Sequence, residues 1–137
     1  MFTLHRILFE TRDPFRTDEE WSILDAIANK PSMAALLPIE HVSVKDLVKT
    51  QDVTGASIAA SAPIIVLDRG DGMFVIDGHH RLRGAEERHA SRIAAHVLLA
   101  PEPLTLATAA MALRVSQHDI LNAMHPNDRM LYASVKD

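Results

Sequence analysis

The segment Asp77-Gly78-His79-His80-Arg81 gathers the side chains best suited to chemistry in this 137-residue chain. It follows a short apolar run and precedes a charged stretch of helical composition, so we expect a strand to become a helix here. The first amides of a helix are unpaired and carry a partial positive charge, which suits an anion. Gly78 has no Cβ and lets a ligand approach the backbone, and Arg81 offers a planar fork for phosphate oxygens.

The other three residues of this segment each have more than one role open to them. His79 and His80 can donate hydrogen bonds and can carry a proton near neutral pH, so both are candidate catalytic residues. Asp77 can cap the helix, hold a histidine in one tautomer, or accept a bond from a ribose hydroxyl. Consecutive helical residues differ by about 100° around the axis, so the histidines do not suit one metal ion, and no metal site is predicted. By its local chemistry the segment suits phosphate or nucleotide binding, but no better than it suits a plain capped helix start.

A hairpin, a helix and a third strand are expected to position this segment. Residues 64–67 and 74–76 are short apolar runs, and the Asp-Arg-Gly-Asp-Gly sequence between them predicts a tight turn. A helix is expected from His79 to about His89, with Leu82 and Ala85 buried. Residues 93–98 read as the third strand. His89 stands where such a helix often ends in glycine.

Helices are expected at both ends of the chain. The first covers residues 18–30, where Thr17 and Glu20 have capping-box spacing and Pro31 ends the helix. The C-terminal helical region covers residues 104–125.

The stretch between the first helix and the hairpin has weaker signals. Leu36 and Leu37 are expected to cover the core, and residues 42–44 read as a strand. A helical turn should follow, with Ser43 and Asp46 spaced as a cap. The whole pattern predicts one α/β (α+β) domain over residues 1–137, with a small mixed sheet, flanking helices and a core at 41–99.

Composition excludes several classes of function. The chain has no cysteine, which removes disulfides, zinc–thiolate sites and cysteine nucleophiles and fits a cytoplasmic location. No apolar run has the roughly 18–20 residues of a membrane helix, and the first residues lack a signal-peptide pattern. The formal net charge of −4 at pH 7 argues against a broad basic surface for nucleic acid.

Residues 41–99 resemble the core of the ParB/sulfiredoxin superfamily. The likeness lies in the strand pair, the Asp-Gly-His-His-Arg box that opens a helix, the strand after it, and an upstream Thr-Gln turn. The resemblance implies that Gly78, His79, His80 and Arg81 bind nucleotide phosphates. It also implies that the opposite wall of the pocket is formed by Thr50, Gln51 and Asp52. The implied ligand is ATP, ADP or CTP, with or without Mg²⁺, and a homodimer is one possible assembly.

The branches of this superfamily differ in their chemistry. Sulfiredoxins use a cysteine where this chain has His79, so that reaction is excluded by the absence of cysteine. The free-serine kinases use a glutamate where this chain has Gln51, and an amide cannot accept a proton from a hydroxyl. Nucleotide-dependent phosphoryl transfer or hydrolysis assisted by His79 or His80, and binding without reaction, both stay open.

A DNA-binding regulator is the competing interpretation. Residues 105–124 have the apolar spacing of a helix-turn-helix at Ala110, Val115, Ile120 and Ala123. Arg114 takes the turn position that normally favours glycine, and the second helix would present Gln117, His118, Asp119 and Asn122. A helical pair that closes the core or forms a dimer contact is the alternative for the same residues.

Overall fold

The computed structural model describes residues 18–50 and 62–132, without the side chain of Leu131. The chain divides into two compact units, which are considered separately. The sheet unit contains the described residues between Leu37 and Pro101, and the helical unit contains those up to Leu36 and from Glu102 onward. Together they form a mixed α/β structure.

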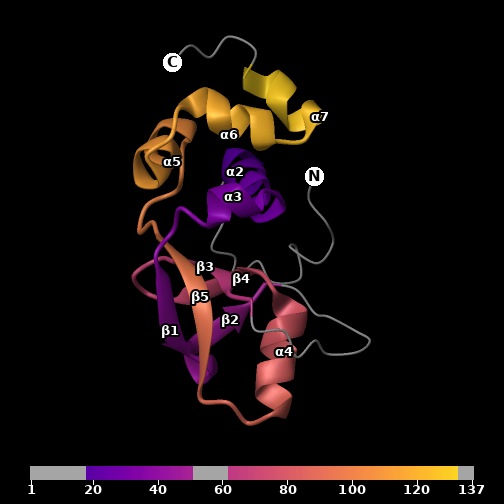
Figure 1. The fold of residues 1–137 in the computed structure, drawn as a ribbon. Coiled ribbons are helices and arrows are strands. Elements are labelled where there is room, and N and C mark those ends of the chain that lie inside the picture. The colour runs from indigo at the N-terminus through magenta and orange to yellow at the C-terminus, as the bar shows by residue number, and fades with distance from the viewer. Residues whose placement is uncertain (1–17, 51–61, 133–137) are drawn as a thin grey trace. The chain divides into compact units, whose positions relative to one another are not determined.

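The sheet unit is built on five strands in the order β1-β5-β3-β4-β2 (Figure 1). Their bounds are β1 Ile39–Ser43, β2 Leu47–Lys49, β3 Ile64–Asp68, β4 Met73–Asp77 and β5 Arg92–Leu99. β1 pairs antiparallel with β5 and β3 pairs antiparallel with β4, while β5 and β3, and β2 and β4, pair parallel. The mixed sheet and the predicted hairpin are therefore confirmed, and β2 is a strand that the sequence did not predict.

The β3–β4 hairpin forms because its two strands and its turn agree. Residues 64–67 are all buried, as β-branched and leucine side chains in a central strand should be. In the turn, the amide of Arg69 donates to the carbonyl of Gly72 at 2.9 Å, and the Asp68 carboxylate accepts from the Gly70 amide at 2.8 Å. The end of β4 is thereby held in register beside β3.

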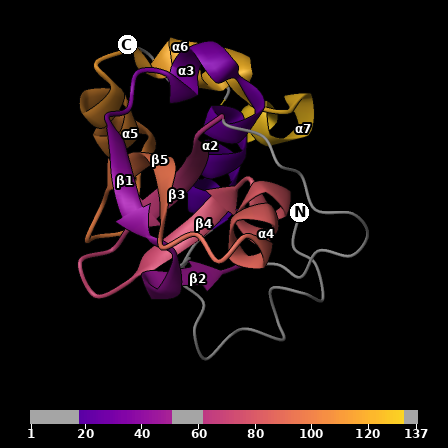
Figure 2. The same cartoon turned by 60° about the horizontal axis from the view of Figure 1, so that its bottom comes forward.

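Helix α4, His79–Glu87, covers one face of this sheet (Figure 2). Leu82 and Ala85 are 1% and 0% exposed, as predicted. Leu82 packs in a cluster of buried residues from the strands, which comprises Val42, Ile64, Val66, Val75, Ala95 and Val97. Burying a leucine side chain contributes roughly 1.5–3 kcal/mol. This cluster fixes α4 and therefore the residues that begin it.

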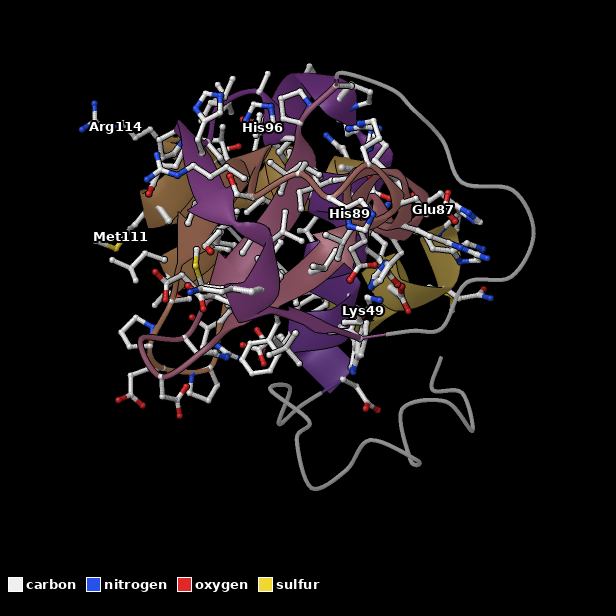
Figure 3. The ribbon with its side chains drawn as sticks, turned by 90° about the horizontal axis from the view of Figure 1, so that it is seen from below. Lys49, Glu87, His89, His96, Met111 and Arg114 are labelled. Atoms are coloured by element: carbon white, nitrogen blue, oxygen red, sulfur yellow. The ribbon has the colours of Figure 1, made fainter. Side chains whose placement is uncertain are left out.

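The C-terminal end of α4 is closed by a Schellman motif. The amide of Ala90 donates to the carbonyl of Ala85 at 2.9 Å, and the amide of His89 donates to the carbonyl of Glu86 at 3.0 Å. His89 has a φ of 56°, the left-handed conformation that glycine adopts most easily, and its side chain is exposed at the end of the helix (Figure 3). This left-handed conformation is the reason why glycine is favoured at the position of His89.

Replacing His89 by glycine is expected to stabilise the sheet unit by about 0.5–1 kcal/mol, because it relieves the left-handed strain at an exposed position. Urea denaturation followed by circular dichroism measures the effect. The matched control is Arg88→Gly, where φ is −86° and glycine should only destabilise. Equal effects of the two substitutions would contradict the expectation.

The helical unit contains two segments that are far apart in the sequence. Its helices are α2 Asp18–Asn29, α3 Pro31–Ala34, α5 Leu106–Leu113, α6 Gln117–Ala123 and α7 Pro126–Arg129, followed by a 3-10 turn, Met130–Tyr132. The helix predicted at residues 18–30 is confirmed as α2. Pro31 does end it, and it also opens the short helix α3, because proline is well suited to the first turn of a helix.

Glu20 has a role that the sequence interpretation missed. Its partner in the predicted capping box, Thr17, lies outside the described residues. Glu20 is 0% exposed, and its carboxylate accepts a hydrogen bond from the amide of Leu104 at 2.6 Å. The neighbouring Glu19 accepts from the amide of Leu106, the first residue of α5, at 3.1 Å. The start of α2 thus satisfies the free amides before and at the start of α5.

Three smaller expectations have mixed outcomes. Leu37 is buried, but Leu36 is 52% exposed, so the prediction for Leu36 is wrong. The helical turn after β1 exists as a 3-10 helix, Val44–Asp46, but the predicted cap is wrong because the Ser43 side chain makes no cap hydrogen bond.

Across residues 18–50 and 62–132, every helix is too short or too polar to cross a membrane.

Candidate phosphate site at the start of α4

Gly78 makes the corner between β4 and α4. It is the N-cap of α4 and has a φ of 99°. A Cβ at this position would lie 2.5 Å from Cγ2 of Ile64 in β3 and 2.8 Å from Nη2 of Arg81. The first helical hydrogen bond runs from the amide of Leu82 to the carbonyl of Gly78 at 2.9 Å, so the amides before Leu82 have no acceptor inside the helix. The corner therefore requires glycine, and the first amides of α4 have no acceptor inside the helix.

Asp77 does not cap α4. No side-chain cap bond is present at the start of this helix, because Asp77 still belongs to β4 and Gly78 takes the N-cap position. The capping role predicted for Asp77 is therefore wrong. Its carboxylate instead accepts from Nη2 of Arg81 at 3.3 Å, one helical turn further on. This ion pair holds the guanidinium back over Gly78.

His79 connects α4 to the end of β2. It is 5% exposed, and its Nε2 accepts a hydrogen bond from the amide of Thr50 at 3.2 Å. The Thr50 hydroxyl donates to the carbonyl of Val75 at 2.6 Å and lies 3.3 Å from the same Nε2. An imidazole nitrogen that accepts from an N–H carries no proton, so this geometry requires neutral His79 with its proton on Nδ1. His79 thus positions Thr50, and Thr50 lies beside the start of α4.

His80 and Arg81 carry buried nitrogen atoms without hydrogen-bond partners. In the described part of the chain, Nδ1 of His80 and Nε of Arg81 are both buried and neither has a partner. Most buried side-chain polar atoms in proteins are satisfied, so such atoms call for an explanation. Both lie in the first turn of α4. A ligand with acceptor oxygens would satisfy them.

Gln51 and Asp52 lie outside the described residues. No three histidine, aspartate or glutamate side chains of residues 18–50 and 62–132 gather closely enough to hold a metal ion. The Asp77 carboxylate in this corner already pairs with Arg81.

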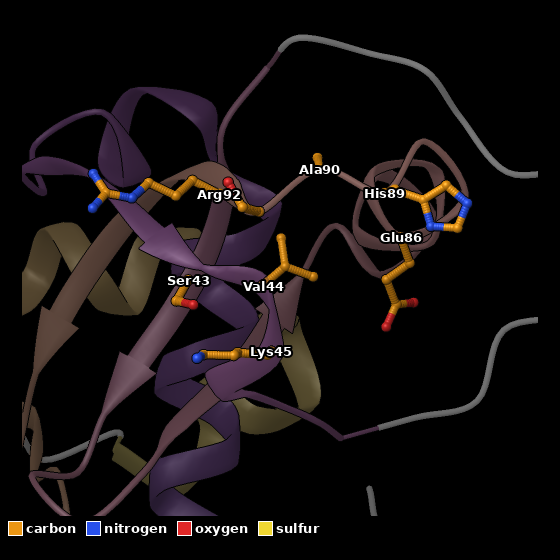
Figure 4. A pocket seen from close by; sticks show the side chains of 8 residues that line it. Ser43, Val44, Lys45, Glu86, His89, Ala90 and Arg92 are labelled. Carbon is orange, nitrogen blue, oxygen red and sulfur yellow. The ribbon is translucent and has the colours of Figure 1, made fainter.

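A hollow lies at the C-terminal end of α4, where no functional residue was predicted from the sequence. It has a volume of about 530 Å³ (Figure 4). The residues that line it are Ser43, Val44, Lys45, Glu86, His89, Ala90, Ser91 and Arg92. They come from the β1 corner, from the end of α4 and from the start of β5. No single segment carries enough of them to form a recognisable motif.

In the helical unit, α5 and α6 are joined by a short turn, residues 114–116. Arg114, at the predicted turn position, has a φ of 59°, and Ala110 and Ile120 are buried. Ser116 and Asp119 form a capping box at the start of α6, with Ser116 accepting from the Asp119 amide at 3.1 Å. Met111 and Arg114 project outward (Figure 3).

The exposed side of α6 carries His118, Asp119 and Asn122, while Gln117 is half-buried. None of these four side chains is a lysine or an arginine. The spacing predicted from the sequence is therefore present in the fold, although a basic surface does not accompany it.

The sequence was also compared with known proteins. It matches no model of a known protein family, and no curated protein matches it. The resemblance to the ParB/sulfiredoxin superfamily stays a prediction.

Proposed function

We propose that the sheet unit binds the phosphate groups of a nucleotide at the start of α4. The observation that carries this proposal is the pair of buried nitrogens without partners, Nδ1 of His80 and Nε of Arg81, in the first turn of a helix whose first amides have no acceptor inside it. A phosphate offers several acceptor oxygens within a small volume, and a helix start favours its charge. The resemblance of residues 41–99 to a nucleotide-binding superfamily points to the same ligand class.

The neighbouring residues support binding more than reaction. Asp77 orients the guanidinium of Arg81, and His79 holds Thr50, so both prepare the site without offering a free catalytic group. His80 is the histidine whose ring can still donate to or accept from a ligand. Because Gln51 replaces the glutamate of the related kinases, phosphoryl transfer or hydrolysis would rely on His80. We therefore favour a nucleotide-binding module, with ATP, ADP or CTP as the ligand.

Calorimetry with ATP, ADP, CTP and GTP in the presence of Mg²⁺ tests the proposal. The wild-type protein should bind at least one of them, and Arg81→Gln should weaken that binding at least tenfold, because a hydrogen bond to a charged group contributes about 1.5–3 kcal/mol. The matched control is Arg83→Gln, since Arg83 lies on the same helix and pairs with Glu87 at 3.5 Å. Its affinity should stay within about twofold of wild type. No binding of any nucleotide, or equal losses in both variants, would reject the proposal.

A helix-turn-helix function for α5 and α6 is a second candidate, favoured by the left-handed turn at Arg114 and the capped start of α6. The electrostatics oppose it. Burial first, and then the carboxylates of Glu19 and Asp128, raise the pKa of Tyr132 to about 12. The exposed side of α6 also presents Asp119 and neither lysine nor arginine to DNA phosphates. A gel-shift experiment at low and high salt decides, because a DNA-binding unit must retard DNA at low salt.

A further inference from the structure

The hollow at the C-terminal end of α4 is separate from the candidate phosphate site. Nine helical residues span about 13 Å, so Gly78 and His89 stand at opposite ends of α4. A volume of about 530 Å³ falls within the range of roughly 300–1,000 Å³ that small-molecule sites occupy. The chemistry of its lining can therefore be considered independently.

The walls of this hollow are held by backbone hydrogen bonds. The amide of Val44 donates to the carbonyl of Ser91 at 3.0 Å, which ties the β1 corner to the start of β5. The Schellman motif at His89 and Ala90 fixes the end of α4. Val44 is half-buried and packs against the core cluster beneath it. A hollow with fixed walls can bind a ligand without a large ordering cost.

The charged side chains that line the hollow differ in their pairing, and the cations lie apart from the carboxylate. Lys45 and Arg92 are exposed and form no ion pair with any described residue, whereas Glu86 pairs with Lys49 at 2.9 Å. Lys45 and Arg92 extend to one side of Val44, and Glu86 and His89 lie on the other (Figure 4). In a chain of net charge −4, two cations without ion pairs on one side of a hollow favour an anionic group there.

The opposite side suits hydroxyl groups. The Glu86 carboxylate accepts hydrogen bonds, and the His89 ring can donate or accept. Ser43 and Ser91 add two hydroxyls to the lining, and Val44 and Ala90 add an apolar surface. We propose that this hollow binds a small hydroxylated carboxylate, such as a sugar acid, with its carboxylate toward Lys45 and Arg92. The hydroxyl groups then face Glu86 and His89.

Titration of the ¹⁵N-labelled protein with gluconate, followed by amide chemical shifts, tests this proposal. Saturable shifts are expected at residues 43–45 and 86–92, and neutral sorbitol should produce none. Lys45→Gln and Arg92→Gln should each weaken gluconate binding about tenfold, as expected when a charged hydrogen bond of about 1.4 kcal/mol is lost. Arg83→Gln, on the same helix but outside the lining, should bind as wild type does.

The two proposed sites can fail independently. Arg81→Gln should lose nucleotide binding and keep gluconate binding, since Arg81 does not line this hollow. The sugar-acid proposal is overturned if gluconate produces no saturable shifts, if sorbitol produces the same shifts, or if the double variant of Lys45 and Arg92 binds as well as wild type. None of these outcomes depends on whether a nucleotide binds at the start of α4.

Discussion

Replacing Gly78 by alanine is expected to destabilise the sheet unit by about 3 kcal/mol. Two effects add at this position. Its φ of 99° costs an L-residue about 1–2 kcal/mol. The new Cβ would also lie 2.5 Å from Ile64 Cγ2, which is 0% exposed in a central strand and has no space to move. Urea denaturation followed by circular dichroism and by amide exchange of β3 and β4 measures the loss.

Gly70→Ala is the matched control for this substitution. Gly70 also has a positive φ, 86°, but the nearest atom to its added Cβ is Cβ of Pro101 at 4.0 Å. Only the backbone strain remains there, so about 1 kcal/mol should be lost. If both alanine variants lose the same stability, the close approach of Gly78 to Ile64 does not contribute. Gly78→Ala should also displace the Arg81 guanidinium, whose Nη2 is 2.8 Å from the new Cβ.

Replacing Glu20 by alanine is expected to destabilise the helical unit by about 3 kcal/mol. The substitution leaves the amide of Leu104 without its acceptor, in a place where both residues are buried. An unsatisfied buried donor costs about 1–3 kcal/mol, and the space left by the missing side chain adds to that cost. Fluorescence of Trp21 reports the unfolding, because it is the single tryptophan of the chain and follows Glu20 in α2.

Two further variants separate the causes of the effect at Glu20. Glu20→Gln keeps an oxygen that can accept from Leu104, so it should lose about 1 kcal/mol only. Glu19→Ala removes the bond to the Leu106 amide at a partly buried site and should also cost about 1 kcal/mol. A loss in Glu20→Ala no larger than that in Glu19→Ala would show that the buried bond to Leu104 contributes little.

Features that depend on neighbouring residues were predicted well. The hairpin, α4, β5 and α2 all have strong local signals, namely β-branched runs, a glycine turn, or apolar residues at helical spacing. The left-handed residues His89 and Arg114 stand at positions where glycine was expected. In these places the local preference and the tertiary packing agree, so the sequence alone suffices.

Features that depend on distant residues were not predicted. β2 has three residues, too few to show a period, and it exists because β4 provides a parallel partner. The bond between Thr50 and His79 joins residues 29 positions apart, and that between Glu20 and Leu104 joins residues 84 positions apart. The hollow at the end of α4 draws on three segments. Sequence spacing carries no information on such pairs until the fold brings them together.

The path of the chain through the sheet has a consequence for how such a protein can be rebuilt. The sheet unit is entered at Leu37, just before β1, and left at Pro101, just after β5. β1 and β5 are neighbours, and the amide of Val97 donates to the carbonyl of Pro38 at 3.0 Å. Entry and exit are therefore adjacent, as in an inserted module that can be exchanged through two nearby junctions. A new segment spliced in at these junctions would need only closely spaced ends.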